Sequence, residues 1–331
     1  MKIKLRSIIA VILFCALLAC SVGLFGCAEK TRSDGNIKII CTVFPLYDWV
    51  RSVVGDTGTV EISLLVSSGA DVHSFQPSFA DMARIKDSDA VVYVGGQSDR
   101  WVEQSVGEDA VSLAVSQFEG VTLYEVSADS LANAHSHEDG EKCHEAHDHA
   151  FDEHIWLSVR NAAAACEKIC STLCELDAEN ADTYRENTRI YTEKLSALDA
   201  RFKEISEKTD EPLVFADRFP FVYLLEDYAI DYYAAFEGCT AEASADFDTT
   251  IGLASKLDSL ERKCLFVTES PVEKGLAESV IEQSKSKGTG VFTLDSMQSI
   301  TASDIENGAS YISVMEKNAD IIWEIFAKAE E

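Results

Sequence analysis

Basic residues are scarce in this sequence. Lys and Arg number 28 against 57 Asp and Glu, which gives a formal net charge of -29. Three of these bases, Lys2, Lys4 and Arg6, lie in an N-terminal segment without acids, so the remaining chain is more acidic still. Nucleic-acid binding requires a basic surface that neutralises phosphates. The charge therefore argues against nucleic acid as a partner and favours the attraction of cations.

Two hydrolase motifs are also missing. The sequence contains no H-E-x-x-H, which places two zinc ligands on one helix, and no G-x-S-x-G, which presents a nucleophilic serine. Cysteine does not form a regular framework either. Seven cysteines follow residue 27, and an odd number is unsuited to complete disulfide pairing. Cys166, Cys170 and Cys174 recur every four residues in an Ala-rich helical stretch, where we expect buried apolar thiols, a three-thiolate metal face being the alternative.

Long apolar runs are limited to residues 8–25. This run follows the basic N-terminus and ends at Leu24-Phe25-Gly26-Cys27, an order typical of a secretory signal. The ending resembles a bacterial lipoprotein box, which implies a signal peptide over residues 1–27, lipidation of Cys27 and a tether over residues 28–36. Cys20 is a poorer candidate, and an uncleaved membrane anchor is the alternative. In every case the remaining chain is exported, because the basic residues stay inside.

The rest of the composition is that of a globular protein, with 47% hydrophobic residues. Short β-rich runs alternate with segments of helical period, which is typical of parallel sheets covered by helices. We predict an α/β fold of two lobes, each with a small parallel four-stranded sheet. The predicted strands are residues 37–44, 60–66, 90–94 and 121–126 in the first lobe, and 213–216, 232–236, 265–268 and 291–294 in the second.

A long amphipathic helix is predicted between the lobes. Ala181–Lys208 contains no Gly or Pro, and its apolar residues recur at helical spacings of three, four and seven. About 28 residues in a helix span roughly 42 Å. With only five prolines in the whole chain, a flexible hinge is not expected. We therefore place the first lobe at residues 37–178, a rigid linking helix at 179–209 and the second lobe at 210–331.

Histidine is concentrated in one segment. Five of the seven histidines lie within fifteen residues of a polar loop, 134–152, that also contains a cysteine. Such a solvated segment can bind a soft or borderline divalent metal weakly, although a merely polar loop is the alternative. The candidate residues of this auxiliary metal loop are His135, His137, Cys143, His144, His147 and His149.

The other two histidines share a sequence context. His73 lies in Asp71-Val72-His73-Ser74-Phe75, and His154 lies in Asp152-Glu153-His154-Ile155-Trp156. A neutral imidazole is a good ligand for Zn(II) or Mn(II), and a nearby carboxylate can select its tautomer. A single histidine is more often a hydrogen-bonded core residue, but two matching contexts beside a His-rich loop favour metal ligation.

These motifs resemble those of the zinc and manganese solute-binding proteins of bacterial ABC importers, over nearly the whole exported chain. The segment Gly69-Ala70-Asp71-Val72-His73-Ser74-Phe75-Gln76-Pro77 is similar to that family's G-x-D-P-H-x-[FY]-x-P. Asp152-Glu153-His154-Ile155-Trp156-Leu157 is similar to its D-P-H-x-W-L, and the run from Thr42 to Tyr47 resembles its first strand and turn. Val72 and Glu153 replace the usual prolines but leave the histidines in place.

The resemblance implies two further ligands from the second lobe. The family's third ligand, His or Glu, falls on Ala216 here, so we take the adjacent Asp217 as a replacement, with Glu242 and Cys239 in reserve. Asp217 could instead pair with Arg218 or cap the following helix. The fourth is Asp295, in Leu294-Asp295-Ser296 where the family has L-D-P, and a turn cap is its alternative role. Two imidazoles and two carboxylates would balance a divalent charge.

The resemblance implies a monomeric, lipid-anchored receptor that captures a divalent ion outside the cell and presents it to an importer permease. Oxygen ligands would suit Mn(II), but family members with His-rich loops are the zinc ones, so we expect Zn(II). A zinc metallohydrolase using Glu153 as general base is one alternative. A surface adhesin or a zinc buffer of the same fold is another.

Overall fold

The computed structural model describes residues 36–66, 72–125, 151–236, 247–269, 274–286 and 288–327. The chain divides into two units, Met1–Asn36 and Ile37–Glu331. The described helices and strands all belong to the second unit. None of these helices combines the length and the apolar character needed to cross a membrane.

The first sheet is parallel, with strand order β2-β1-β3-β4. Its strands are β1 (Ile37–Cys41), β2 (Val60–Leu64), β3 (Ala90–Tyr93) and β4 (Val111–Ala114). The helices α2 (Phe44–Val54) and α3 (Phe79–Lys86) lie between successive strands in the sequence. Ser78 caps α3 with a reciprocal capping box, because its hydroxyl accepts from the amide of Asp81 while the Asp81 carboxylate accepts from the amide of Ser78.

The fourth strand of this sheet is not the one predicted. β4 pairs with β3 over Val111–Ala114, whereas residues 121–124 form no strand and Glu125 makes only an isolated antiparallel bridge with Phe151. Side chains satisfy the backbone of that segment instead. The amide of Thr122 donates to Asn161 Oδ1 at 2.8 Å, and its carbonyl accepts from Asn161 Nδ2 at 3.0 Å. A β-rich composition therefore did not translate into a strand, because tertiary partners took the backbone groups.

The second sheet repeats the architecture, with order β6-β5-β7-β8 and parallel pairing throughout. Its strands are β5 (Leu213–Phe215), β6 (Tyr232–Ala234), β7 (Cys264–Val267) and β8 (Gly290–Thr293). Its shorter helices are α6 (Val222–Asp227), α7 (Phe247–Ser259), α8 (Lys274–Gln283) and α9 (Ala302–Glu306). Two parallel four-stranded sheets flanked by helices confirm the predicted fold class.

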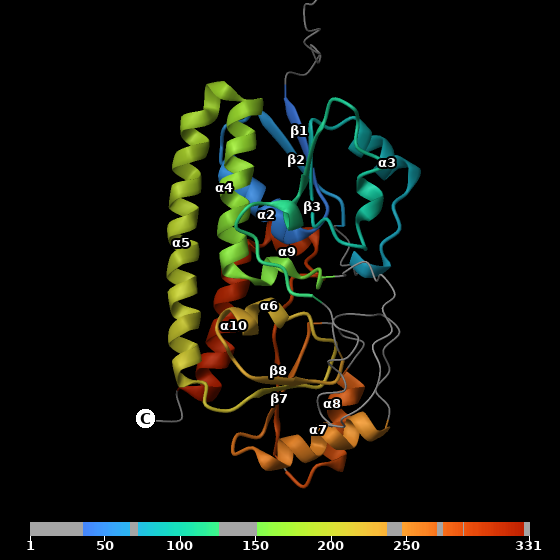
Figure 1. Ribbon diagram of the computed structural model, residues 1–331, viewed down its shortest axis with the longest axis vertical. Helices are drawn as coiled ribbons and strands as arrows, with labels where there is room; N and C mark the ends of the chain where they lie inside the picture. The colour runs from blue at the N-terminus through green and yellow to red at the C-terminus, as the bar shows by residue number, and fades with distance from the viewer. Residues whose placement is uncertain are drawn as a thin grey trace, which may run out of the picture. The chain divides into compact units, whose positions relative to one another are not determined.

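Three long helices pack together beside the two sheets. They are α4 (Val159–Leu176), α5 (Ala181–Lys208) and α10 (Tyr311–Phe326), and α5 has the predicted bounds. Figure 1 shows α4 along the first part of α5 and α10 along its second part. One cluster of buried side chains continues from Ile39 in β1, across α5, to Phe326 in α10. The two lobes therefore share a hydrophobic core.

The described cysteines contribute to this core. Cys41, Cys166, Cys170, Cys174 and Cys264 are free thiols, and all but the half-buried Cys174 are buried. Burial raises the pKa of Cys41 and Cys166 above the ordinary thiol range, so both stay protonated at neutral pH. The predicted role of the α4 cysteines as buried apolar side chains accords with this environment.

Candidate metal centre

His73 lies in a short 3-10 helix beyond the carboxyl end of β2. This helix, η2, spans Val72–Ser74. The imidazole is partly exposed, and its Nδ1 lies 2.9 Å from Ser98 Oγ and 3.1 Å from Glu153 Oε2. Ser98 belongs to the loop that follows β3, so two strand ends of the first sheet position this ring. Carboxyl ends of parallel strands are where open α/β sheets bind ligands.

His154 precedes a second 3-10 helix, η6 (Ile155–Leu157), and is buried, with 1% of its surface exposed. Its Nδ1 lies 2.8 Å from Asp152 Oδ1, and the same oxygen accepts from the His154 amide at 2.9 Å. A proton on Nδ1 that is donated to Asp152 makes Nε2, which lies 3.1 Å from His73 Nε2, the acceptor nitrogen of this ring. In the Asp-x-His sequence, one Asp152 oxygen therefore contacts both the main-chain amide and the ring of His154, and these two contacts together orient the ring.

The two predicted histidines face one another. Their Nε2 atoms are 3.1 Å apart and their ring centroids 5.1 Å apart, although 81 residues separate them in sequence. Each ring uses its Nδ1 to contact a carboxylate, Glu153 for His73 and Asp152 for His154. Two imidazoles whose Nε2 atoms converge while carboxylates contact their Nδ1 atoms could supply two of the four ligands of a tetrahedral site for a divalent ion.

Carboxylates govern the electrostatics beside the pair. Burial opposes ionisation of Glu153, but hydrogen bonds from His73 and Ser98 outweigh it and lower the pKa of that carboxyl to about 2. Burial has the opposite net result for Asp99, whose pKa rises to about 6 although the amides of Val94, Gly95 and Gly96 donate to it. The surroundings of the histidines are thus anionic, which attracts a cation.

Asp217 follows β5 in the second lobe and is buried, with 1% of its surface exposed. Its Oδ2 accepts from the amide of Thr268 at 2.7 Å and from the Thr268 hydroxyl at 2.6 Å, while its Oδ1 accepts from the amide of Arg218 at 2.7 Å. This carboxylate therefore joins the ends of β5 and β7. The carboxylate has about four lone-pair positions, so an ion would have to be bound by a position that these three hydrogen bonds do not use.

Asp295 follows β8 by two residues and is partly buried. Its main chain is bracketed by Asn318 of α10, which accepts from the Asp295 amide at 2.9 Å and donates to its carbonyl at 2.8 Å. Its Oδ1 accepts from the amide of Met297 at 2.7 Å. Burial and the nearby charge of Glu269 raise the pKa of Asp295 to about 6. A cation would relieve the repulsion between these two carboxylates.

The structure brings His73 and His154 together but does not add Asp217 or Asp295 to them. Within the described ranges, no group of three or more His, Cys, Asp or Glu side chains surrounds a common point. The assignment of the two aspartates as ligands stays a prediction. The other candidates lie outside the described residues: the lipidation candidate Cys27, the reserve ligands Cys239 and Glu242, and the loop residues His135, His137, Cys143, His144, His147 and His149.

Sequence reasoning missed three residues that organise this region. Ser98 contacts His73, Asn318 holds the main chain of Asp295, and Glu269 accepts hydrogen bonds from the loop after Asp295. Glu269 carried a usable signal, because it lies just beyond β7 at the same carboxyl edge as Asp217 and Asp295. Ser98 and Asn318 carried none, since their partners are distant in sequence.

Most of this chain is similar to known zinc-uptake and zinc-binding proteins. A family model described as zinc-uptake complex component A, periplasmic, matches residues 39–325. The zinc-binding lipoprotein AdcA of Streptococcus pneumoniae is 29% identical over 300 residues, which are 90% of this chain and 58% of that protein. The chain therefore spans little more than half the length of AdcA.

Two further similarities cover nearly the whole of the matched chain. The high-affinity zinc uptake system protein ZnuA of Bacillus subtilis is 25% identical over 322 residues, 94% of this chain and 95% of that protein. The crystal structure of the Zn(II)-bound ZnuA-like domain of Streptococcus pneumoniae AdcA matches with a TM-score of 0.68 at 23% identity, covering 88% of this chain and 99% of that one. At that identity the structural match shows a shared fold.

Proposed function

Because this chain belongs to the family of periplasmic zinc-uptake components, we propose that it is an extracytoplasmic receptor that captures Zn(II) and delivers it to the permease of an ABC importer. The observation that carries the proposal is the convergence of His73 and His154, with their Nε2 atoms 3.1 Å apart and their Nδ1 atoms against carboxylates. Neutral imidazoles arranged in this way suit zinc. Zinc is cargo here, so no bond of a substrate is made or broken.

The proposal assigns the remaining ligands to the second lobe. Asp295 is supported by its position at the carboxyl edge of the second sheet and by its proximity to a second carboxylate, Glu269. Asp217 has weaker support, since three hydrogen bonds already occupy its carboxylate. Two imidazoles and acidic oxygens would neutralise the ion within the protein.

The cellular setting belongs to the same proposal. We propose that lipidation of Cys27 anchors a monomeric receptor to the bacterial cell membrane, and that the His-rich loop, 134–152, is an auxiliary zinc-binding segment. The lipoprotein name of the AdcA relative supports the anchor. Five imidazoles in one loop favour zinc over manganese, which prefers oxygen ligands.

A hydrolytic function is less well supported by the site. Glu153 would be its general base, but that carboxylate is engaged by Ser98 and His73 and its pKa is about 2. Such a weak base removes a proton from water inefficiently at neutral pH. We therefore propose a binding protein rather than an enzyme.

The first prediction tests the histidine pair. Replacing either partner, His73→Ala or His154→Ala, should weaken zinc binding by about a hundredfold or more, because each change removes one ligand and leaves the other imidazole alone. The measurement is competition with a chromophoric chelator of known affinity, together with native mass spectrometry in mixed zinc and manganese. His147→Ala is the matched control from the loop and should leave tight binding intact.

Removal of residues 135–149 is the second arm. A protein without this loop should still retain one tightly bound zinc ion, with weaker extra ions lost. Loss of all tight binding on loop removal, with unchanged affinity in both site variants, would place the cargo in the loop and overturn the proposal. If the wild type bound manganese in preference to zinc, the proposed cargo would be manganese instead of zinc.

A further inference from the structure

The loop that follows Asp295 is organised by one carboxylate from a neighbouring strand end. Glu269 Oε2 accepts from the amide of Ser296 at 2.8 Å, and its Oε1 accepts from the Ser296 hydroxyl at 2.8 Å. The same Oε1 accepts from the amide of Gln298 and from the Ser299 hydroxyl, both at 3.2 Å. Four donors from three loop residues, Ser296, Gln298 and Ser299, thus converge on the Glu269 carboxylate. Four is about the number of hydrogen bonds that the two oxygens of a carboxylate ordinarily accept.

The conformation of this loop needs such support. Met297 has φ of 64°, in the left-handed region that a non-glycine residue adopts at a cost of about 1 kcal/mol or more. Its amide is turned back onto Asp295 Oδ1 at 2.7 Å. The position of the Asp295 carboxylate is therefore coupled to the backbone of Met297, and that backbone lies between two residues held by Glu269.

The loop also contacts the segment that carries His154. Trp156 Nε1 donates to the carbonyl of Ser296 at 2.9 Å, and both residues are buried with 1% of their surface exposed. The Trp156 ring packs on the ring of His154, with 5.2 Å between centroids. Ser296 is therefore held on two sides, by Glu269 of its own lobe and by Trp156 of the other.

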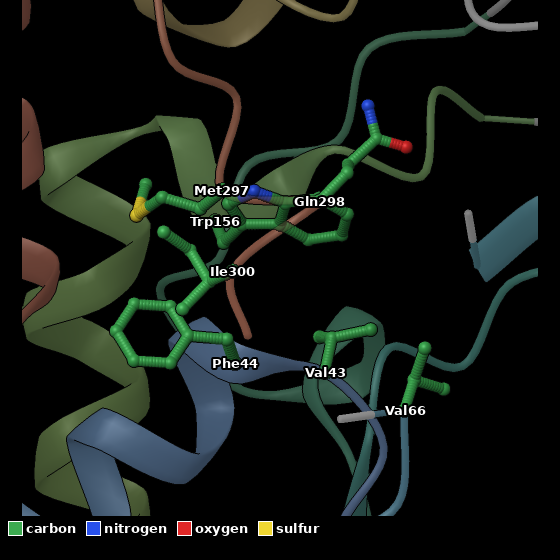
Figure 2. A pocket seen from close by; sticks show the side chains of 7 residues that line it. All are labelled: Val43, Phe44, Val66, Trp156, Met297, Gln298 and Ile300. Carbon is green, nitrogen blue, oxygen red and sulfur yellow. The ribbon is translucent and has the colours of Figure 1, made fainter. Parts of the chain in front are cut away.

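Apolar packing surrounds this contact. Figure 2 shows Trp156 beside Met297 and Gln298, with Phe44 and Ile300 below. These side chains line a cavity of about 10 Å³, which is room for about one water molecule. Because Trp156 and Ser296 are both buried, a shift of the loop would be passed to the side chains packed on either side of their contact.

We propose that Glu269, in the second lobe, is a positioning residue for the zinc ligand Asp295. By accepting hydrogen bonds from Ser296, Gln298 and Ser299, it fixes the loop that carries Asp295. Because Ser296 also binds Trp156, the same hydrogen bonds set the distance between the Asp295 carboxylate and the segment that carries His154. The inference rests on the proposed function, since it takes Asp295 as a zinc ligand. Glu269 itself would not contact the ion. It acts through Asp295, so replacing Glu269 should change zinc affinity only when the Asp295 carboxylate is present.

The test is a double-mutant cycle on zinc affinity. Glu269→Gln keeps the size of the side chain but sets an amide N–H against the donors of the loop, so zinc affinity should fall about 10- to 100-fold, as for other residues that orient metal ligands. In the Asp295→Ala background, where there is no carboxylate left to place, the same change should have little further effect. A residue with a merely structural role would weaken binding by the same factor in both backgrounds.

Two further variants complete the design. Glu278→Gln, on the exposed face of α8, is the matched control and should leave zinc affinity unchanged. Trp156→Phe keeps an aromatic ring while removing the donor to Ser296, and should reproduce part of the loss caused by Glu269→Gln. Zinc affinities come from chelator competition on each folded protein, with the melting temperature of the metal-free form recorded in parallel.

The outcomes separate this inference from the proposed function. No tight zinc binding by the wild type would overturn the proposed function and this inference together. Tight binding by the wild type with equal losses from Glu269→Gln in both backgrounds, or with no loss in either, would overturn the positioning role alone. Unchanged affinity in Asp295→Ala would likewise overturn it, while leaving the histidine pair as the zinc site.

Discussion

Single carboxylates orient the groups around the histidine pair. Asp152 binds both the amide and Nδ1 of His154, and Glu153 binds Ser98 and Nδ1 of His73. Asp99 gathers the amides that follow β3. Charge-assisted hydrogen bonds of this kind are stronger than neutral ones. The two rings are consequently oriented by acids that are not among the predicted ligands, so the geometry of the pair is defined without an ion.

Asp99 gives a prediction for pH. Burial raises its pKa in the folded protein to about 6, from 3.8 for an ordinary Asp, so the folded state holds the proton more tightly than the unfolded chain. The stability contributed by protonation of this group is fully present below about pH 4 and is lost as the pH rises through about 6. The free energy of unfolding of the wild type, relative to that of Asp99→Asn, should therefore fall by up to about 3 kcal/mol over that range.

Urea unfolding of the metal-free protein at a series of pH values measures this difference. Asp182→Asn, whose side chain lies fully exposed on α5, is the control for the effect of an Asp to Asn change as such. An unfolding difference between wild type and Asp99→Asn that stays flat from about pH 4 to about 6, or that rises, would show that Asp99 is ionised over this range.

At the scale of elements, three helices meet on one buried carboxylate. Asp48 of α2 is 0% exposed; its Oδ2 accepts from the amide of Tyr311 at 2.9 Å, at the start of α10, and from the hydroxyl of Tyr191 in α5 at 3.3 Å. Its Oδ1 accepts from Arg51. Asp48 thus supplies the first amide of α10 with an acceptor from another lobe, where a negative charge also favours the helix dipole.

We expect Asp48→Ala to destabilise the protein by about 3 to 5 kcal/mol, because it leaves the Tyr311 amide without its acceptor and the Arg51 guanidinium beside a buried cavity. The measurement is the free energy of unfolding from chemical denaturation. Asp320→Ala is a matched control, since Asp320 of α10 also pairs with α5, through Arg201, but on the surface. That exposed pair should contribute only about 0 to 1 kcal/mol. Equal losses of unfolding free energy in Asp48→Ala and Asp320→Ala would show that the buried carboxylate of Asp48 stabilises the protein no more than an exposed one.

At the scale of the whole folded unit, the lobes are joined by more than a linking helix. The buried cluster that begins at Ile39 runs through α4, α5 and α10 into the second sheet. Polar contacts accompany it around the His154 segment: the Tyr223 hydroxyl donates to the carbonyl of Asp152 at 2.7 Å, and the Tyr311 hydroxyl donates to that of Trp156 at 2.8 Å. Residues of the second lobe thus hold the segment that presents a histidine of the first.

A shared core predicts cooperative unfolding. The metal-free protein should unfold in one thermal transition whose calorimetric and van't Hoff enthalpies agree, because neither lobe can expose its part of the cluster alone. Differential scanning calorimetry tests this directly. Two resolved transitions, or hydrogen exchange that opens one sheet well before the other, would contradict the continuous core.

Much of this architecture was predictable from local pattern. The alternation of β-rich and helical runs indicated two parallel sheets, and the apolar spacing of Ala181–Lys208 indicated a helix with those bounds. The repeated Asp-x-His-x-aromatic context singled out His73 and His154. These signals depend on periods of a few residues, so they survive in the sequence whatever the distant partners are.

Contacts between distant segments were decided only by the tertiary structure. Residues 121–126 have the composition of a strand, yet Asn161 binds the backbone there and Val111–Ala114 joins the sheet instead. The hydrogen bonds between Asp217 and Thr268 likewise join strand ends that are 51 residues apart in sequence. Those between Glu269 and the loop after Asp295 join strand ends that are 27 residues apart. Short-range preference determines that an element forms, whereas packing and hydrogen-bond satisfaction determine which of its groups remain to meet a ligand.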